Sequence, residues 1–245
     1  MQGRLRSALI GIALSLAAAA AGARTLPLPD TLISLASEQG EHLLLESEAR
    51  ESYWPLSIYL ETQQNGAYCG VASIVIVLNA LGIEAPATPE HAPYRMFTQT
   101  NVLNSQTEAV VPQTVLLRQG MTLDQIGGIL EVYGVAVSVH HAADSSVDAF
   151  RLLARQALAT PGHYVIVNYL RSAIGQERGG HISPLAAYDA DSDRFLILDV
   201  SRYKYPPVWV ATEDLFRAMN TMAEPDALDS SRGFVLIAPV VSPQP

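Results

Sequence analysis

Cys69 is the only cysteine of the 245-residue chain, and it stands two residues before the apolar run 71–78. This run predicts a buried helix with Cys69 at its N-terminus. Backbone N–H groups and the helix dipole at such an end favour a thiolate over a thiol. A lone thiol in this place suits nucleophilic chemistry, although a small buried and inert cysteine is the alternative when this residue is considered alone.

A β-hairpin is predicted in the second half of the chain. The ranges 182–188 and 194–200 are apolar, and the aspartate-rich stretch 189–193 separates them. Two extended runs around such a turn are typical of an antiparallel strand pair. Pro184 cannot donate a ladder hydrogen bond, so we expect the first strand to be irregular or to lie at a sheet edge.

The hairpin supplies a candidate base. If the turn is centred on Ala190, His181 lies opposite Asp199, and the carboxylate can hold one imidazole nitrogen and leave the other free. A one-residue slip would break this pair. With Cys69 as nucleophile, His181 as general base and acid and Asp199 as orienting group, the side-chain amide of Gln63 and the backbone N–H of Cys69 are the expected oxyanion donors. By spacing alone, a surface histidine and a turn carboxylate stay an alternative.

The remaining elements predict an α+β fold with two lobes and a cleft between them. Helices are expected from the apolar periodicity and capping residues over 71–81 with Gly82 as the stop, over 122–133, and over 147–159. Further strands are expected over 163–170 and 233–239. The proline-rich range 85–112 has no regular pattern, so it is predicted to be a long functional loop.

Composition and the N-terminus indicate an exported enzyme-sized domain. The chain is 49% hydrophobic with a net charge of −9, which argues against nucleic acid or an anionic membrane as partner. Arg4 and Arg6 precede the apolar stretch 8–21, and small residues follow at 21–23, which together are typical of a signal peptide. We therefore expect residues 1–23 to be removed, 24–245 to form one catalytic domain in the bacterial periplasm, and no stable membrane insertion after cleavage. An uncleaved anchor is the alternative.

Three segments carry a resemblance to a known family. The ranges 62–73 (TQQNGAYCGVAS), 180–188 (GHISPLAAY) and 198–210 (LDVSRYKYPPVWV) together resemble phytochelatin synthase, in the same order along the chain. The resemblance implies a papain-like cysteine peptidase fold, with Cys69 on a helical lobe and His181 and Asp199 on an antiparallel sheet lobe. It also implies glutathione as substrate: Cys69 attacks the Cys–Gly bond, glycine leaves, and a γ-Glu-Cys thioester passes to water or to a second glutathione.

The resemblance implies a set of substrate-binding residues as well. Arg232 matches a family arginine that holds the γ-glutamyl carboxylate, which suits a bidentate guanidinium. Asp226 is the expected partner of the substrate amine, with Glu224 as the second choice because the spacing differs from the family pattern. Arg202 is either a substrate contact or a structural ion-pair residue, and Gly180 and Ser183, beside His181, are expected to contact substrate.

Departures from the family pattern bear on metal and acceptor. Plant members carry a cysteine-rich C-terminal extension, and this chain resembles the short bacterial members, which favour glycine release. One thiol and scattered histidines lack a ligand spacing, so no protein-borne metal site is expected, and His140-His141 is interpreted as a solvated pair. No covalently bound cofactor is expected. Cadmium or zinc would enter as a glutathione thiolate complex.

Two other functions stay open from the sequence. A papain-like peptidase acting on another peptide would use the same three residues. A non-catalytic thiol protein would bind metal or a partner and would not need His181. The motifs around His181 and Asp199 extend beyond what a bare triad needs, which favours glutathione chemistry. A homodimer is an open alternative for the oligomeric state.

Overall fold

The computed structural model describes residues 25–89, 91–222 and 231–240. The predicted signal peptide, residues 1–23, lies outside the described residues, so its cleavage stays a prediction. Across the ranges that are described, no helix has both the length and the apolar character needed to cross a membrane.

The first half of the described chain is mainly helical, and most of the strands lie in the second half. In chain order they are β1 (Ile33–Ser34), α1 (Glu38–Glu46), α2 (Tyr53–Ile58), α3 (Cys69–Ala80), α4 (Ser105–Val110), α5 (Gln113–Gln119), α6 (Leu123–Val132), β2 (Ala136–His141), α7 (Val147–Leu158), β3 (Tyr164–Leu170), β4 (Gly180–Asp189), β5 (Arg194–Ile197), β6 (Val208–Ala211), α8 (Thr212–Met219) and β7 (Gly233–Ala238). Short 3-10 helices at Ala142–Asp144 and Arg171–Ile174 follow β2 and β3.

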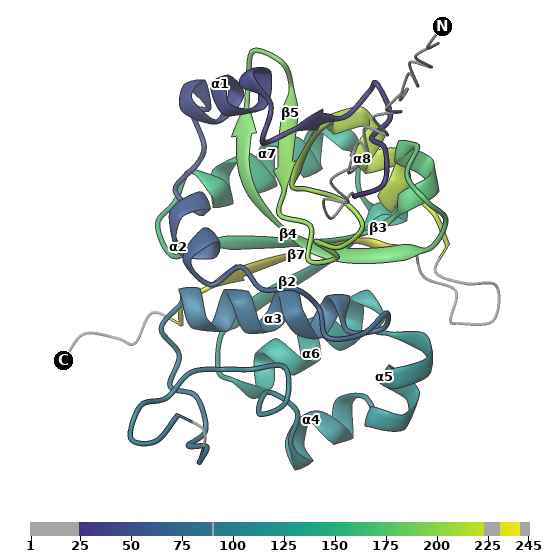
Figure 1. Ribbon diagram of the computed structural model, residues 1–245. Helices are drawn as coiled ribbons and strands as arrows, with labels where there is room; N and C mark the ends of the chain where they lie inside the picture. The colour runs from purple at the N-terminus through teal and green to yellow at the C-terminus, as the bar shows by residue number, and fades with distance from the viewer. Residues whose placement is uncertain (1–24, 90, 223–230, 241–245) are drawn as a thin grey trace, which may run out of the picture.

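The strands form one antiparallel sheet in the order β1-β6-β5-β4-β3-β7-β2. Helices α3 and α6 pack on one face of this sheet, and α7 and α8 pack on the other. In Figure 1 the helices α3 to α6 gather on one side of the strands β2, β3, β4 and β7, whereas α7 and α8 lie on the opposite side. A mixed α+β architecture with an antiparallel sheet is therefore confirmed.

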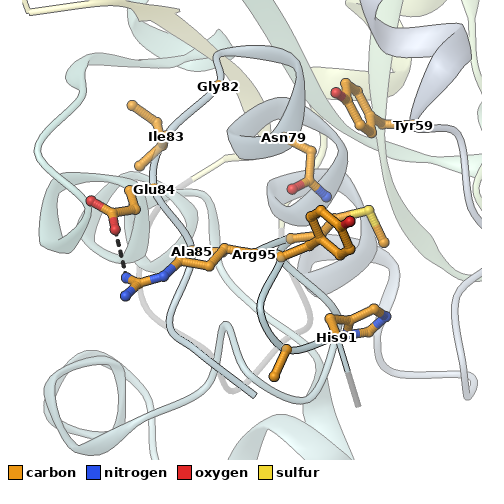
Figure 2. A pocket seen from close by; sticks show the side chains of 11 residues that line it. Tyr59, Asn79, Gly82, Ile83, Glu84, Ala85, His91 and Arg95 are labelled. Carbon is orange, nitrogen blue, oxygen red and sulfur yellow. Dashed lines mark hydrogen bonds and ion pairs between the residues drawn. The ribbon is translucent and has the colours of Figure 1, made fainter. Parts of the chain in front are cut away.

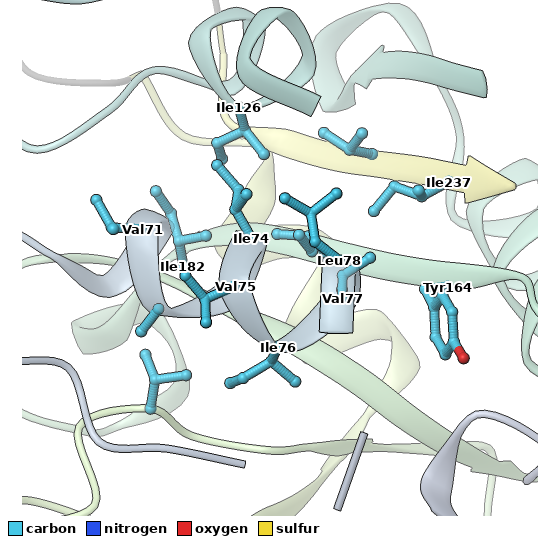
Figure 3. Close-up of a cluster of buried hydrophobic side chains, with 14 of the residues drawn as sticks. Val71, Ile74, Val75, Ile76, Val77, Leu78, Ile126, Tyr164, Ile182 and Ile237 are labelled. Carbon is cyan, nitrogen blue, oxygen red and sulfur yellow. The ribbon is translucent and has the colours of Figure 1, made fainter. Parts of the chain in front are cut away.

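Helix α3 is the centre of the larger apolar core. Residues 69–78 are all buried, because the helix is apolar nearly all round and is covered by the sheet on one side and by other helices elsewhere. Figure 3 shows Ile74, Val75 and Leu78 among side chains from α6 and from strands β3, β4 and β7. The helix ends where Gly82 takes a φ of 67°, as the sequence predicted.

Capping residues place two more helices as expected. Thr122 accepts a hydrogen bond from the backbone N–H of Gln125, and the Gln125 side chain accepts one from the backbone N–H of Thr122, which forms the predicted capping box of α6. Ser146 accepts from the N–H of Ala149 at the start of α7. Helix α7 then buries Phe150 against the second face of the sheet.

Two expectations about irregular structure need correction. The range 85–112 contains α4, whose start is capped by the side chain of Asn104, so the region is not loop throughout. Strand β4, which contains Pro184, lies inside the sheet between β3 and β5, so the edge alternative is wrong. The irregular alternative is confirmed, because the pairing of β4 with β5 shifts between Leu185 and Ala187.

Replacing Ile76 by alanine should lower the free energy of unfolding by about 2–5 kcal/mol, because this side chain is 0% exposed in a tightly packed core. The matched control is Ile58→Ala, since Ile58 is 75% exposed and its truncation should change stability by about 0.5 kcal/mol or less. Urea unfolding followed by circular dichroism measures both. Equal losses in the two variants would contradict the buried position of α3.

Candidate active site

Cys69 is the first residue of α3, and its thiol is buried against strand β4. Two contacts set this position. The hydroxyl of Ser73, one turn into the helix, lies 2.8 Å from the carbonyl oxygen of Cys69 and 3.3 Å from that of Ile182. A Cβ added at Gly70 would lie 3.2 Å from Met121 and 3.3 Å from Ile182. The glycine after the cysteine thus allows the helix end to approach β4 at the residue that follows His181.

Burial sets the resting protonation state of Cys69. It raises the pKa of the thiol, and a backbone hydrogen bond with Ile182 and the charge of Arg171 lower it only in part. The helix N-terminus alone does not make this cysteine a thiolate. The unliganded protein therefore holds a thiol that must lose its proton to a neighbouring base before it can attack.

His181 is oriented by two hydrogen-bond partners. Its Nε2 lies 2.9 Å from Oδ1 of Asp199 and 2.9 Å from the hydroxyl of Ser183, and the ring makes an edge contact with Tyr169. All these groups are buried. Because Nε2 is engaged, the tautomer with a proton on Nε2 leaves Nδ1 free to accept a proton. The structure thus brings together the predicted His181 and Asp199.

The predicted hairpin register is wrong even though the pair forms. Leu185 pairs with Ile197, whereas Ala187 pairs with Leu196, so a bulge adds one residue to β4. The turn is not centred on Ala190 as expected. The sequence predicted the turn but not the bulge, which lies between Leu185 and Ala187.

The bulge decides on which face Asp199 lies. Beyond it, the N–H of Leu198 donates to the carbonyl of Pro184 at 3.0 Å, so Asp199 stands beside Ser183. Ser183 and His181 are two residues apart and share one face of β4, and the carboxylate reaches the imidazole along the diagonal. Without the extra residue, Asp199 would stand beside Pro184 and point to the opposite face.

Arg171 is a site residue that the sequence analysis missed. It follows β3, is 3% exposed, and its guanidinium nitrogens lie 2.8 Å from both carboxylate oxygens of Asp199. It also donates to Gln176 and lies over the ring of Tyr205. A cation directly after an apolar strand was the available signal, but nothing in the sequence linked it to a residue 28 positions away.

The buried charges around His181 nearly balance. Burial would raise the pKa of the Asp199 carboxyl, but His181 and Arg171 outweigh it and hold this pKa well below its usual range. Burial lowers the pKa of His181, and the charge of Asp199 offsets this only in part. The resting site therefore holds a carboxylate paired with Arg171, a neutral imidazole and a neutral thiol.

Gln63 lies in the irregular segment before α3 and is also buried. Its amide oxygen accepts a hydrogen bond from Ser201 at 2.6 Å, and its amide nitrogen donates to the carbonyl of Asn65 at 2.5 Å. The Gln63 backbone N–H donates to Val200, next to Asp199. One amide proton of Gln63 is left for a ligand, so the geometry agrees with the expected oxyanion donor but does not test that role.

The predicted substrate residues fall into different places. The Arg232 guanidinium lies against Gly180, where an added Cβ would come within 3.2 Å of Nη2, and it donates to Thr221. Ser183 is fully buried beside His181. Arg202 is exposed and makes no salt bridge with a described residue. Asp226 and Glu224 lie outside the described residues.

Asn168 is a second residue that the sequence did not single out. It stands in β3 opposite Ile182 of β4 and Gly233 of β7, and it is 5% exposed. Cross-strand neighbours share one face, so Asn168 lies on the same face as Gly180 and Ile182.

Both histidines of the pair interpreted as solvated are partly exposed, and both also contact protein groups. His140 stacks on Phe234, and His141 bonds the carbonyl of Ser231 at 2.7 Å and the carboxylate of Asp124 at 3.1 Å. Among the described residues, no group of three or more His, Cys, Asp and Glu side chains could hold a metal ion. Entry of cadmium or zinc with glutathione stays a prediction.

A cavity of about 690 Å³ lies at the other end of α3. Figure 2 shows Asn79, Tyr59 and His91 around it, together with the ion pair of Arg95 and Glu84. Cys69 and Asn79 are ten residues apart, which corresponds to about 15 Å along a helix. This cavity is therefore separate from the cysteine and histidine described above.

His181 is hydrogen-bonded to the buried Asp199, and the helix that begins with Cys69 meets β4 at Ile182, the residue after His181. Enzymes that form a thioester with their substrate use a cysteine, a histidine and an orienting group of this kind. A family model described as phytochelatin synthase matches residues 23–234. The chain belongs to this family.

Curated relatives agree with this assignment. Glutathione gamma-glutamylcysteinyltransferase 1 of Lotus japonicus is 35% identical over 218 residues, which cover 88% of this chain and 42% of the relative. The protein of that name from Arabidopsis thaliana is 32% identical over 218 residues, 88% of this chain and 43% of its own. The Schizosaccharomyces pombe transferase is 26% identical over 219 residues, 88% of this chain and 51% of its own. The chain thus spans about half the length of these relatives or less.

Replacing Arg171 by methionine should shift the pH profile of Cys69 alkylation upward, because the guanidinium charge lowers the pKa of the thiol. The rate of iodoacetamide labelling, followed by mass spectrometry across pH, measures this without any substrate. Arg171→Lys keeps the charge and should shift the profile less. An unchanged profile in a folded Arg171→Met protein would contradict the electrostatic link.

Proposed function

We propose that this protein cleaves glutathione at its Cys–Gly bond through a γ-Glu-Cys thioester on Cys69. The observation that carries the proposal is the hydrogen bond of 2.9 Å between His181 and Asp199, next to the helix that begins with Cys69. The names of the curated relatives add glutathione as the substrate. We also propose a papain-like fold, supported by a cysteine-bearing helix packed on an antiparallel sheet that carries the histidine.

The first half-reaction uses the neutral pair described above. Nδ1 of His181 takes the proton of the Cys69 thiol as sulfur attacks the carbonyl carbon, and the oxyanion is held by the Gln63 amide and the Cys69 N–H. The C–N bond then breaks, and His181 returns its proton to the nitrogen of the departing glycine. Asp199 keeps the ring in the tautomer that this sequence of steps needs.

The second half-reaction differs only in the acceptor. Water attacks the thioester to give γ-Glu-Cys, or the amine of a second glutathione attacks it to give a phytochelatin. In both cases His181 takes a proton from the acceptor. The C–S bond then breaks, and the proton returns to sulfur, which restores the Cys69 thiol. Both acceptors fit the same thioester, so the ratio of γ-Glu-Cys to phytochelatin decides which of them this protein prefers. Cadmium or zinc would act as part of a glutathione thiolate acceptor.

Substrate recognition is proposed for the surface near Gly180. The Arg232 guanidinium is suited to the γ-glutamyl carboxylate. It contacts Gly180, the residue directly before His181. Asp226, or Glu224 in its place, is proposed to bind the substrate amine. We place the mature protein in a bacterial periplasm on the basis of residues 1–23, which have the pattern of a signal peptide.

Incubation of the mature protein with glutathione should release glycine and γ-Glu-Cys, and Cys69→Ala should reduce glycine release to background. His181→Ala should lower kcat by about 10³-fold or more, because the thiol of the resting site is protonated and needs this base. Mass spectrometry quantifies glycine, γ-Glu-Cys and phytochelatin with and without cadmium or zinc.

Arg155→Ala is a suitable control, since this residue of α7 is exposed and forms none of the hydrogen bonds described for the site, so it should keep full activity. The ratio of γ-Glu-Cys to phytochelatin reports whether water or glutathione is the preferred acceptor. Absence of glycine release from folded wild-type protein would reject glutathione chemistry and favour a peptidase with another substrate.

A further inference from the structure

The segment that carries Gln63 has no helix or strand to hold it. Residues 60–68 connect α2 to α3 without regular structure, yet Gln63 and Tyr68 within them are buried. An oxyanion donor must be fixed to within a fraction of an ångström, because a displacement of about 1 Å can cost 10²-fold in rate. Contacts from elsewhere in the chain must therefore set this backbone.

Gln99 supplies two of these contacts. Its side-chain oxygen accepts a hydrogen bond of 2.8 Å from the N–H of Gln64, and its side-chain nitrogen donates one of 3.0 Å to the carbonyl of Thr62. The side chain is 1% exposed, so water does not compete for either bond. One amide thus binds the backbone on both sides of Gln63.

Gln99 is itself held by a rigid segment. Phe97 donates its N–H to the side-chain oxygen of Asn79 at 2.9 Å and accepts from the Asn79 nitrogen at 3.0 Å, so residues near 97 are fixed to the last turns of α3. The Phe97 ring is buried against Tyr133, whose hydroxyl donates to Val102. The 96–103 segment, defined by these contacts, therefore moves with α3.

Helix α3 becomes the common reference for nucleophile and oxyanion donor. Its first residue is Cys69, and its penultimate residue, Asn79, is hydrogen-bonded to the 96–103 segment. Gln99 of this segment is in turn hydrogen-bonded to the backbone beside Gln63. The proline-rich range that the sequence analysis marked as a functional loop thus has a physical connection to the site.

We propose that Gln99 is a positioning residue for catalysis, which fixes the Gln63 amide at the oxyanion by hydrogen bonds to Thr62 and Gln64. The inference rests on the proposed function, because it requires Gln63 to be the oxyanion donor. Gln99 itself touches no reacting atom.

Gln99→Leu should lower kcat for glycine release by about 10- to 100-fold with KM changed by less than about threefold, because binding groups elsewhere are untouched. In a Gln63→Ala background the same change should cost less than about threefold more, since the donor it positions is already absent. Gln99→Ala removes the same two bonds without introducing a charge, so its kcat should fall by a similar factor. If the fold-losses in kcat of Gln63→Ala and Gln99→Leu multiply in the double variant, the proposal is overturned.

Asn101→Ala is the matched control. Asn101 makes comparable side-chain bonds within the same segment, to Thr98 and Met96, but none to residues 62–64. Thermal melts of all variants check that each is folded, and if Gln99→Leu is not, Gln99→Ala carries the same comparison. We expect Asn101→Ala to keep kcat within about threefold of wild type, and a loss equal to that of Gln99→Leu would overturn the proposal.

Hydrogen exchange separates a failure of this inference from a failure of the proposed function. Amide exchange across residues 60–66, measured without substrate, should rise at least about tenfold in Gln99→Leu and stay unchanged in Asn101→Ala. If exchange is faster in Gln99→Leu but the wild-type protein releases no glycine, the glutathione reaction is rejected, whereas the positioning of residues 62–64 by Gln99 is supported. Unchanged exchange in Gln99→Leu would overturn the proposal whatever the activity.

Discussion

The buried ion pair of Arg171 and Asp199 is the interaction on which the site depends. A carboxylate with no exposed surface is costly unless opposite charge and hydrogen bonds surround it. Here Arg171, the Ser201 N–H and His181 all approach the same group. The carboxylate is thereby charged at any physiological pH, and the imidazole it holds can remain neutral. Loss of Arg171 would leave an uncompensated buried anion rather than a missing surface contact.

The second constraint is that one helix serves both the core and the chemistry. Helix α3 contributes the largest run of buried apolar side chains, and its first residue is the nucleophile. Close packing leaves the thiol little freedom relative to β4, where His181 lies. The precision of the site is therefore a by-product of core packing, and mutations deep in this core would disturb both stability and geometry.

The sequence predicted features that arise from local rules. Apolar periodicity and Gly82 located α3, and the residues Thr122 and Ser146 located the starts of α6 and α7, because caps act within one turn. The pairing of His181 with Asp199 was predicted from a register that proved wrong. The two residues still meet, because a bulge in β4 places Asp199 on the same face of the sheet as His181. Arg171 and Gln99 could not be predicted, since each acts on residues far away along the chain and carries no local pattern.

The burial of Cys69 has a consequence for its resistance to oxidation. Oxidants such as hydrogen peroxide react with thiolates, and their reaction slows when a thiol is protonated and shielded. A cysteine that is 8% exposed, with a raised pKa and no second cysteine for a disulfide in the chain, meets both conditions. The same burial that keeps the thiol protonated until a base removes its proton thus also protects the sulfur from oxidation between turnovers.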